Sequence, residues 1–185
     1  MSALTIYPED QATQGVTSRD FSAIAEQLQV LGVRFERWRA EHEFAADAEP
    51  EAVLDAYRGS IDNLKQQYGF QSMDVISLKA DHPSKDQLRQ KFLSEHTHSD
   101  FEVRFFVEGQ GLFYLHVANK VYAVLCEQGD LISVPANTTH WFDMGANPDF
   151  KCIRLFTTED GWVAEFTGSP IAERFPTLDQ YLTGL

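Results

Sequence analysis

Four residues in the second half of the chain have side chains that bind divalent transition metals. His96, His98 and Glu102 lie within one short segment, and His140 follows in a later strand-like segment. Alternate side chains of a strand point to the same face, so an extended segment aims His96, His98 and Glu102 at one point. His140 can then complete the set from across a barrel. We therefore predict that these four residues hold one metal ion.

The ligand types indicate what this metal centre is for. Structural zinc sites usually include thiolates and are closed at four ligands, whereas this set contains no thiolate. Three imidazoles with one carboxylate suit Fe(II), Ni(II), Co(II) or Mn(II), and an octahedral shell keeps about two positions open for water or substrate. The set therefore predicts a catalytic centre. His42, His82 and His116 are interpreted as ordinary polar residues.

Arg104 is the charged residue most strongly associated with the predicted ligands. It has the same strand parity as Glu102, so we expect it to face the interior. A buried guanidinium is costly unless it meets an anion, and Arg104 is therefore predicted to hold an anionic, oxygen-rich substrate. The alternative is a structural ion pair with Glu108 or Glu95.

Aromatic residues near the ligands predict an apolar pocket. Phe142 has the parity of His140, and Phe92 lies shortly before the ligand segment, where it can cover the site. Phe106 has the parity of Arg104 and is expected in the barrel core. A substrate that fits this pocket combines an anionic head with an apolar tail.

The elements that must position these residues fall into two groups. Before Phe92, apolar spacing predicts helices over 20–31, 50–68 and 84–91, and strands over 33–38 and 74–79. A capping box from Ser84 to Gln87 is expected to begin the third helix. After Phe92, close turns separate short strands, which we expect at 103–108, 112–117, 121–126, 131–134, 140–144, 151–156 and 162–167. A helix is predicted over 170–182.

This pattern predicts a mainly β chain with flanking helices (α+β), folded as an antiparallel barrel or jelly roll. We expect a single domain over 1–185, with a helix and strand extension at 1–91, a barrel core at 92–168 and a C-terminal helical segment at 169–185. No internal repeat or low-complexity segment divides it.

Composition and charge exclude several classes of protein. The 185 residues are 43% hydrophobic and 12% aromatic, as in globular proteins. The formal net charge is −13, which disfavours binding to nucleic acid or anionic membranes. No apolar run is long enough to span a bilayer, and no secretory signal is visible. Two cysteines, Cys126 and Cys152, fit a reducing cytoplasm better than a disulfide scaffold.

The ligand residues resemble the two motifs of the cupin superfamily. The first motif corresponds to His96, His98, Glu102 and Gly109, and the second to Gly129, Pro135 and His140. Two motif glycines are replaced, by Gln90 and Asn137, and neither of these positions supplies a ligand. Longer stretches resemble the bacterial acireductone dioxygenase family, namely GVRFERW (32–38), DVISL (74–78), EHTHSDFEVRFFVEG (95–109), DLISVPANTTHWFDMG (130–145) and GWVAEFTG (161–168).

This resemblance implies a monomeric cupin jelly-roll β-barrel that binds Fe(II) or Ni(II) through His96, His98, Glu102 and His140. The implied substrates are O2 and acireductone, 1,2-dihydroxy-5-(methylthio)pent-1-en-3-one, in methionine salvage. The iron form of the family yields 4-methylthio-2-oxobutanoate and formate. The nickel form yields 3-methylthiopropanoate, formate and carbon monoxide.

The resemblance also implies roles for individual residues. Arg104 stabilises the substrate anion, and Phe92, Phe142 and Trp162 surround the methylthio tail. Glu95 occupies an acidic position associated with metal uptake. Phe101 departs from the family, because an acid often stands immediately before the ligand glutamate.

Two other functions compete with this one. Metal cupins with similar ligands include decarboxylases and isomerases, and some cupins are non-enzymatic binding modules. The aromatic pocket disfavours a sugar substrate. The absence of a basic helix-turn-helix pattern disfavours a DNA-linked sensor.

Overall fold

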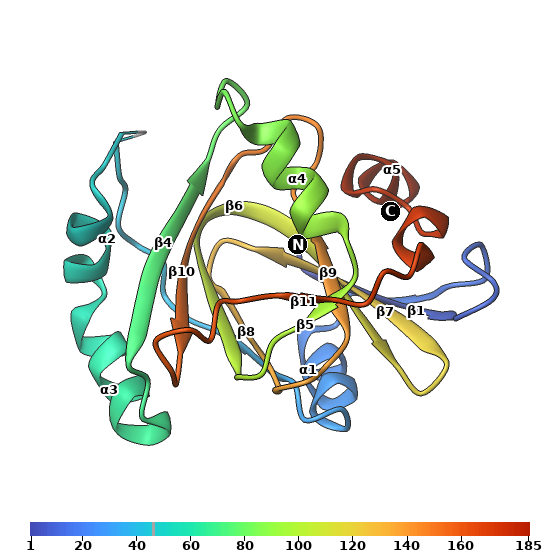
Figure 1. The fold of residues 1–185 in the computed structure, drawn as a ribbon, viewed down its shortest axis with the longest axis horizontal. Coiled ribbons are helices and arrows are strands. Elements are labelled where there is room, and N and C mark those ends of the chain that lie inside the picture. The colour runs from blue at the N-terminus through green and yellow to red at the C-terminus, as the bar shows by residue number, and fades with distance from the viewer. Residues whose placement is uncertain (46) are drawn as a thin grey trace.

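The computed structural model describes residues 1–45 and 47–185, and β-strands dominate it (Figure 1). The strands are β1 (Ala3–Pro8), β2 (Val16–Ser18), β3 (Arg34–Arg37), β4 (Ser72–Leu78), β5 (His96–Thr97), β6 (Glu102–Val117), β7 (Lys120–Glu127), β8 (Asp130–Val134), β9 (His140–Asp143), β10 (Phe150–Phe156) and β11 (Glu165–Phe166). All pairings between them are antiparallel. The predicted class, mainly β with flanking helices, is confirmed.

Strand β6 joins the two halves of the sheet. Its first half pairs with β8 and β10, and its second half pairs with β7 and β9. The sequence predicted two strands separated by a turn at 109–111, and this was wrong, because β6 bends at Gly109 without ending. Gly109 has φ +70°, and a Cβ there would lie only 1.9 Å from the carbonyl oxygen of Asp149. Glycine is therefore required where the strand changes partners.

The strands of the N-terminal half belong to the same sheet as the later ones. β1 pairs with β7, β3 with β8, and β4 with β10, so segment 1–91 contributes to the barrel wall rather than only flanking it. Within the described ranges, the main run of paired strands ends at β2 and β11, β4 and β3 end the branches through β10 and β8, and the sheet does not close into a ring. The predicted domain boundaries stay a prediction.

The helices largely follow their predicted segments. They are α1 (Phe21–Gln29), α2 (Pro50–Ala56), α3 (Arg58–Tyr68), α4 (Lys85–Leu93), the 3-10 helix η1 (Ile171–Arg174) and α5 (Leu178–Gly184). The expected single helix over 50–68 is interrupted at Tyr57. The C-terminal helix is likewise split, because Pro176 lacks an N–H and Thr177 caps a new helix. Ser84 makes no side-chain cap, so the predicted capping box was wrong.

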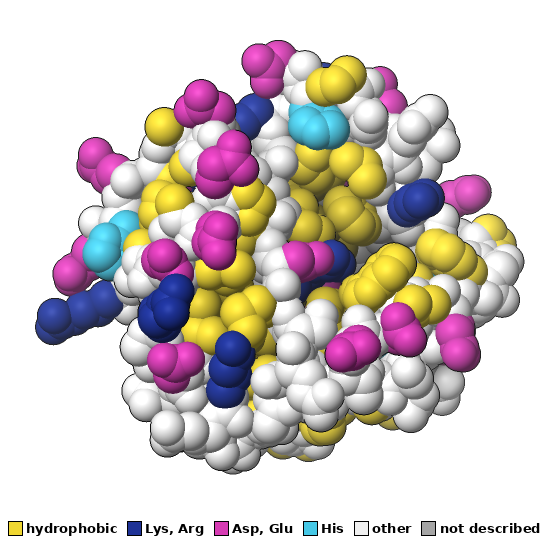
Figure 2. Space-filling view, turned by 60° about the vertical axis from the view of Figure 1, so that its left-hand side comes forward, with side chains coloured by type: hydrophobic (Ala, Val, Ile, Leu, Met, Phe, Trp, Pro, Cys, Tyr) yellow, Lys and Arg dark blue, Asp and Glu magenta, His cyan; other side chains and the backbone are white. Residues whose placement is uncertain are grey.

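A layer of aromatic rings fills the interior beside the bend of β6. Phe113 and Phe142 have ring centroids 4.9 Å apart, and Phe106 and Phe150 pack on the same cluster. Acidic side chains are spread over the face seen in Figure 2, with apolar side chains visible between them. In the described part of the chain, every helix is too short or too polar to cross a membrane.

Asp143 ties three elements together at the end of β9. Its buried carboxylate accepts from Nε (2.8 Å) and a terminal nitrogen (3.1 Å) of Arg89 on α4, and from the N–H of Leu178 at the start of α5 (2.7 Å). Burial acts to raise the pKa of Asp143, but these bonds and the Arg89 charge outweigh it and lower that pKa. Helix α4, which carries Phe92 and leads to the histidines, is thereby anchored to the strand of His140.

We predict that Asp143→Asn lowers the free energy of unfolding by about 3 kcal/mol, because it breaks a buried ion pair. Urea titration of the metal-free protein measures this. The lowered pKa means that the contribution of Asp143 is complete above the unfolded-state pKa of about 3.9 and is lost as pH falls through the folded value. The control is Asp149→Asn at an exposed ion pair with Lys79, expected within about 0.5 kcal/mol of the parent. Equal effects of the two variants would contradict the prediction.

Candidate metal centre

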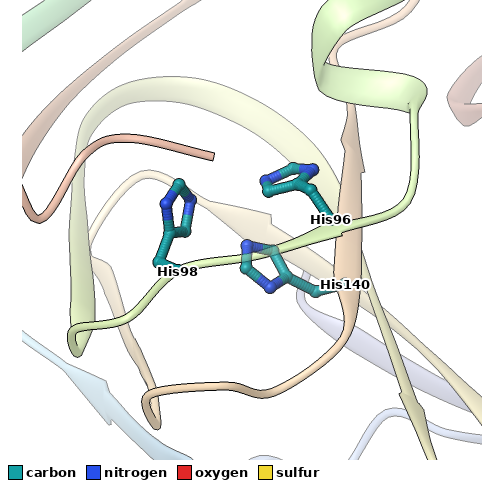
Figure 3. A group of neighbouring side chains, drawn as sticks. All are labelled: His96, His98 and His140. Carbon is teal, nitrogen blue, oxygen red and sulfur yellow. The ribbon is translucent and has the colours of Figure 1, made fainter. Parts of the chain in front are cut away.

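Three of the four predicted ligands converge at one point (Figure 3). Their ligand atoms lie within 4.8 Å of one another, and all three side chains are buried; they are His96, His98 and His140. His96 and His140 are directly paired residues of β5 and β9. Elsewhere in the described ranges, histidine, cysteine and acidic residues form no comparable group.

Strand parity predicted that the ligand segment is one extended strand, and the structure shows that it is not. β5 ends at Thr97, a bend follows, and β6 begins at Glu102. His98 therefore approaches the centre from the bend rather than from the strand that carries His96. The three histidines still converge, and the bend brings them together rather than the two-residue period of a strand.

Backbone carbonyls orient all three imidazole rings. Nδ1 lies 2.7 Å from the Ser94 oxygen in His96, 2.9 Å from the Val163 oxygen in His98 and 2.7 Å from the Thr138 oxygen in His140. A carbonyl can only accept, so each Nδ1 carries a proton, and in the neutral ring Nε2 is left with the lone pair that binds a metal. This is how metal-binding histidines are held. Sequence reasoning missed these contacts, because backbone groups leave no residue-type signal.

Glu102 completes the donor set from the start of β6. It is 1% exposed, and its Oε2 lies 3.3 Å from Nε2 of His98 and 3.2 Å from Nε2 of His140. Neighbouring ligand atoms around one ion with bonds of ~2.1 Å are about 3 Å apart. Electron-rich atoms that face each other at this distance need a proton or a cation between them. The residues present therefore fit a divalent metal ion, although Glu102 lies outside the mutual group of the three histidines.

Burial and neighbouring charges set the protonation of the metal-free site. Burial, with the nearby His140, lowers the pKa of His96 to about 4, so this ring is neutral at pH 7. Burial also acts to lower the pKa of His98, but the hydrogen bond and charge of Glu102 outweigh it and raise that pKa. Burial acts to raise the pKa of Glu102, yet Arg104 and the two histidines hold it well below its usual range. At His98, a metal ion therefore competes with a proton.

Arg104 lies inside the barrel beside the ligands, as strand parity predicted. It is 3% exposed, and its Nε donates to Oε1 of Glu102 over 2.5 Å. The ion-pair partner is thus the predicted ligand itself, and not Glu108 or Glu95. One terminal nitrogen, Nη1, is buried without a hydrogen-bond partner in the described structure. An unpaired buried donor is costly, which marks a place for an oxyanion.

Aromatic rings enclose the Arg104 guanidinium. Its carbon lies 4.7 Å from the ring centre of Phe142, 4.8 Å from that of Phe113 and 5.7 Å from that of Phe92. Phe92 and Phe142 also contact each other edge to face. These rings exclude water from one side of the site. Phe113, which the sequence did not single out, belongs to this wall because Phe113 and Phe142 are directly paired on β6 and β9.

The other two predicted site residues differ in environment. Trp162 is 54% exposed in the segment before β11. Glu95 is buried, with Oε2 2.8 Å from Nδ1 of His116 and Oε1 accepting from the Thr167 hydroxyl. His116 also lies 3.4 Å from Glu9, so it is a paired polar residue, as interpreted. The predicted roles of Trp162 and Glu95 stay predictions.

The barrel and its inward histidines define a metal-binding protein of the cupin type. Residues 3–164 match the model of the ARD/ARD' family. Two similar proteins are both named acireductone dioxygenase. The one from Methylococcus capsulatus is 62% identical over 98% of each chain, and the one from Aquifex aeolicus is 58% identical over the full length of both. The chain belongs to the ARD/ARD' family.

A solved structure supports the same assignment. It is described as acireductone dioxygenase from Bacillus anthracis with cadmium ion in the active center, and it superposes with a TM-score of 0.79 at 30% identity. The match covers 90% of this chain and 98% of that one. The cupin fold predicted from the sequence is thereby confirmed.

We predict that His140→Ala abolishes stoichiometric metal binding, because it removes one convergent Nε2. Metal content after reconstitution with Ni(II) and gel filtration, measured by mass spectrometry, should fall at least about 10-fold. His116→Ala, which alters a partly buried histidine outside the group, should retain the metal. Retention of metal by His140→Ala would contradict the assignment.

Proposed function

We propose that this chain is a metal-dependent acireductone dioxygenase, which cleaves 1,2-dihydroxy-5-(methylthio)pent-1-en-3-one with O2. The observation that carries the proposal is the unpaired Nη1 of Arg104 next to three convergent histidines and Glu102. The membership of the family and the name shared by the similar proteins support the same activity. His96, His98, Glu102 and His140 are the proposed ligands.

The residues of the chain divide the work of binding this substrate. The enediol loses a proton readily, and the resulting oxyanion needs a positive partner in a strongly acidic protein. The hydrogen bond from Nε to Glu102 holds Arg104 in place, so its unpaired Nη1 donates to that oxyanion in a fixed direction. When bound, the metal ion supplies Lewis acidity towards the oxygen atoms of the substrate.

The apolar wall selects the other end of the substrate. Phe92 and Phe142 offer ring surface, and thioether groups pack well against aromatic rings. Exclusion of water from this wall also strengthens the electrostatic interactions at Arg104. Trp162 closes the remaining side of the pocket, and Glu95 assists metal uptake.

The resident metal is Fe(II) or Ni(II), one per chain, and it determines the products. Both sets of products balance: acireductone and O2 give formate with 4-methylthio-2-oxobutanoate, or formate and carbon monoxide with 3-methylthiopropanoate. The ligands are the same for either metal. We further propose that the chain acts as a monomeric single domain in the cytoplasm, in methionine salvage.

The direct test is reconstitution of metal-free protein separately with Fe(II) and Ni(II) under O2. We predict loss of acireductone with both metals, measured by absorbance. Carbon monoxide, measured by gas chromatography, should form only with nickel. Protein with the His140→Ala change is the matched control. Absence of turnover with either metal would refute the proposed function. Turnover of a panel of carboxylic acids instead would favour a decarboxylase.

Arg104→Ala tests the role of the guanidinium. We predict that the metal-loaded variant keeps its metal, because the bound cation neutralises the buried Glu102 carboxylate in place of Arg104, while kcat/KM falls about 100-fold or more with the loss of the oxyanion donor. Arg39→Ala, at an exposed arginine, is the control and should match the parent. If Arg104→Ala instead loses its metal or unfolds, the residue serves mainly as the ion-pair partner of Glu102.

A further inference from the structure

Residues 157–166, here called the strap, run from the end of β10 to β11, which lies beside β5, the strand that carries His96 (Figure 1). Two contacts join the strap to proposed ligand residues. The Val163 carbonyl accepts from Nδ1 of His98 at 2.9 Å, and Phe166 on β11 pairs with His96 on β5. The orientation of the His98 ring, and the position of the backbone that carries His96, therefore depend on where the strap lies.

The strap has little apolar burial to hold it in place. Trp162, Val163 and Phe166 are 54%, 46% and 55% exposed. The hydrophobic contribution to docking is therefore small, and polar contacts must supply the rest.

Asp100 supplies those polar contacts from the bend between His98 and Glu102. Its side chain is 94% buried, since only 6% is exposed. Oδ2 accepts from the N–H groups of Thr157 (2.6 Å) and Thr158 (2.8 Å) and from the Thr158 hydroxyl (3.3 Å). Oδ1 accepts from the Thr157 hydroxyl and from the N–H of Phe101. One carboxylate thus connects the start of the strap to the ligand segment.

Gly161, in the middle of the strap, also lies close to Asp100. A Cβ on Gly161 would lie 2.5 Å from Oδ2 and 3.1 Å from Cβ of Asp100. Only glycine lets the strap turn over the carboxylate at this distance. The contact is therefore specific in shape as well as in hydrogen bonding.

We propose that Asp100 is a positioning residue that holds the strap against the metal centre, and so fixes His98 through the Val163 carbonyl and keeps Trp162 beside the pocket. This proposal rests on the proposed function only in the place it gives Trp162 beside the substrate pocket. Its structural consequence concerns the metal-free protein, and can be measured without substrate. Asp100 contacts neither the substrate nor the metal in this account.

The test compares Asp100→Asn with Asp160→Asn, which removes the same charge from an exposed position on the strap. Hydrogen–deuterium exchange of the metal-free proteins should show about 10-fold faster exchange over residues 157–166 in Asp100→Asn alone. Ni(II) affinity should fall about 10- to 100-fold, as for other residues that orient ligands. Thr157→Val removes one hydroxyl donor and should give a smaller change in the same direction.

The outcomes separate this proposal from the proposed function. If strap exchange and Ni(II) affinity in Asp100→Asn equal those of Asp160→Asn, the positioning role is overturned. If Asp100→Asn fails to fold, unchanged strap exchange in Thr157→Val overturns it. If the parent protein shows no turnover of acireductone, the proposed function fails, while the exchange and affinity results still decide the role of Asp100.

Discussion

The buried ion pair between Glu102 and Arg104 is the interaction on which the site depends. Burial of either charge alone is costly, and the strand places them on one face, two residues apart. In this pair Oε1 of Glu102 accepts from Arg104, Oε2 faces the histidines, and Nη1 of Arg104 stays unpaired. The same contact thus serves the metal donors and the anion donor. The aromatic rings then exclude water, which strengthens this electrostatic arrangement.

Around this pair, polar contacts hold the site together, some within one segment and others between segments far apart in the sequence. Three carbonyl oxygens orient the imidazoles, Asp143 anchors the helix that carries Phe92, and Asp100 joins the strap to the ligand segment. Helix α4 and strand β9 also share the contact of Phe92 with Phe142, whereas the strap has little buried apolar surface. The precision of the site therefore comes from hydrogen bonds around a core that is otherwise filled with aromatic rings.

Several features were predictable because local physics determines them. The alternation in 33–38 became β3, and the closely spaced turns after Phe92 became an antiparallel sheet. The interior position of Arg104 followed from its parity with Glu102. Errors arose where tertiary contacts override local signals. Gly109 resembles a turn residue but bends one long strand, and the predicted strand at 162–167 shortens to β11, because only two of its residues find a partner.

By itself, the sequence determined which atoms are available for chemistry: three imidazoles, one carboxylate and one guanidinium, on segments with strand or turn character. It also determined the family, through motifs that extend along most of the chain. Only the folded backbone decided which nitrogen of each imidazole points inward, because backbone carbonyls make that choice: two residues earlier for His96 and His140, and from distant Val163 for His98. The tertiary structure alone decided that Arg104 pairs with Glu102, and that Asp100 holds the strap, because both depend on groups brought together by folding.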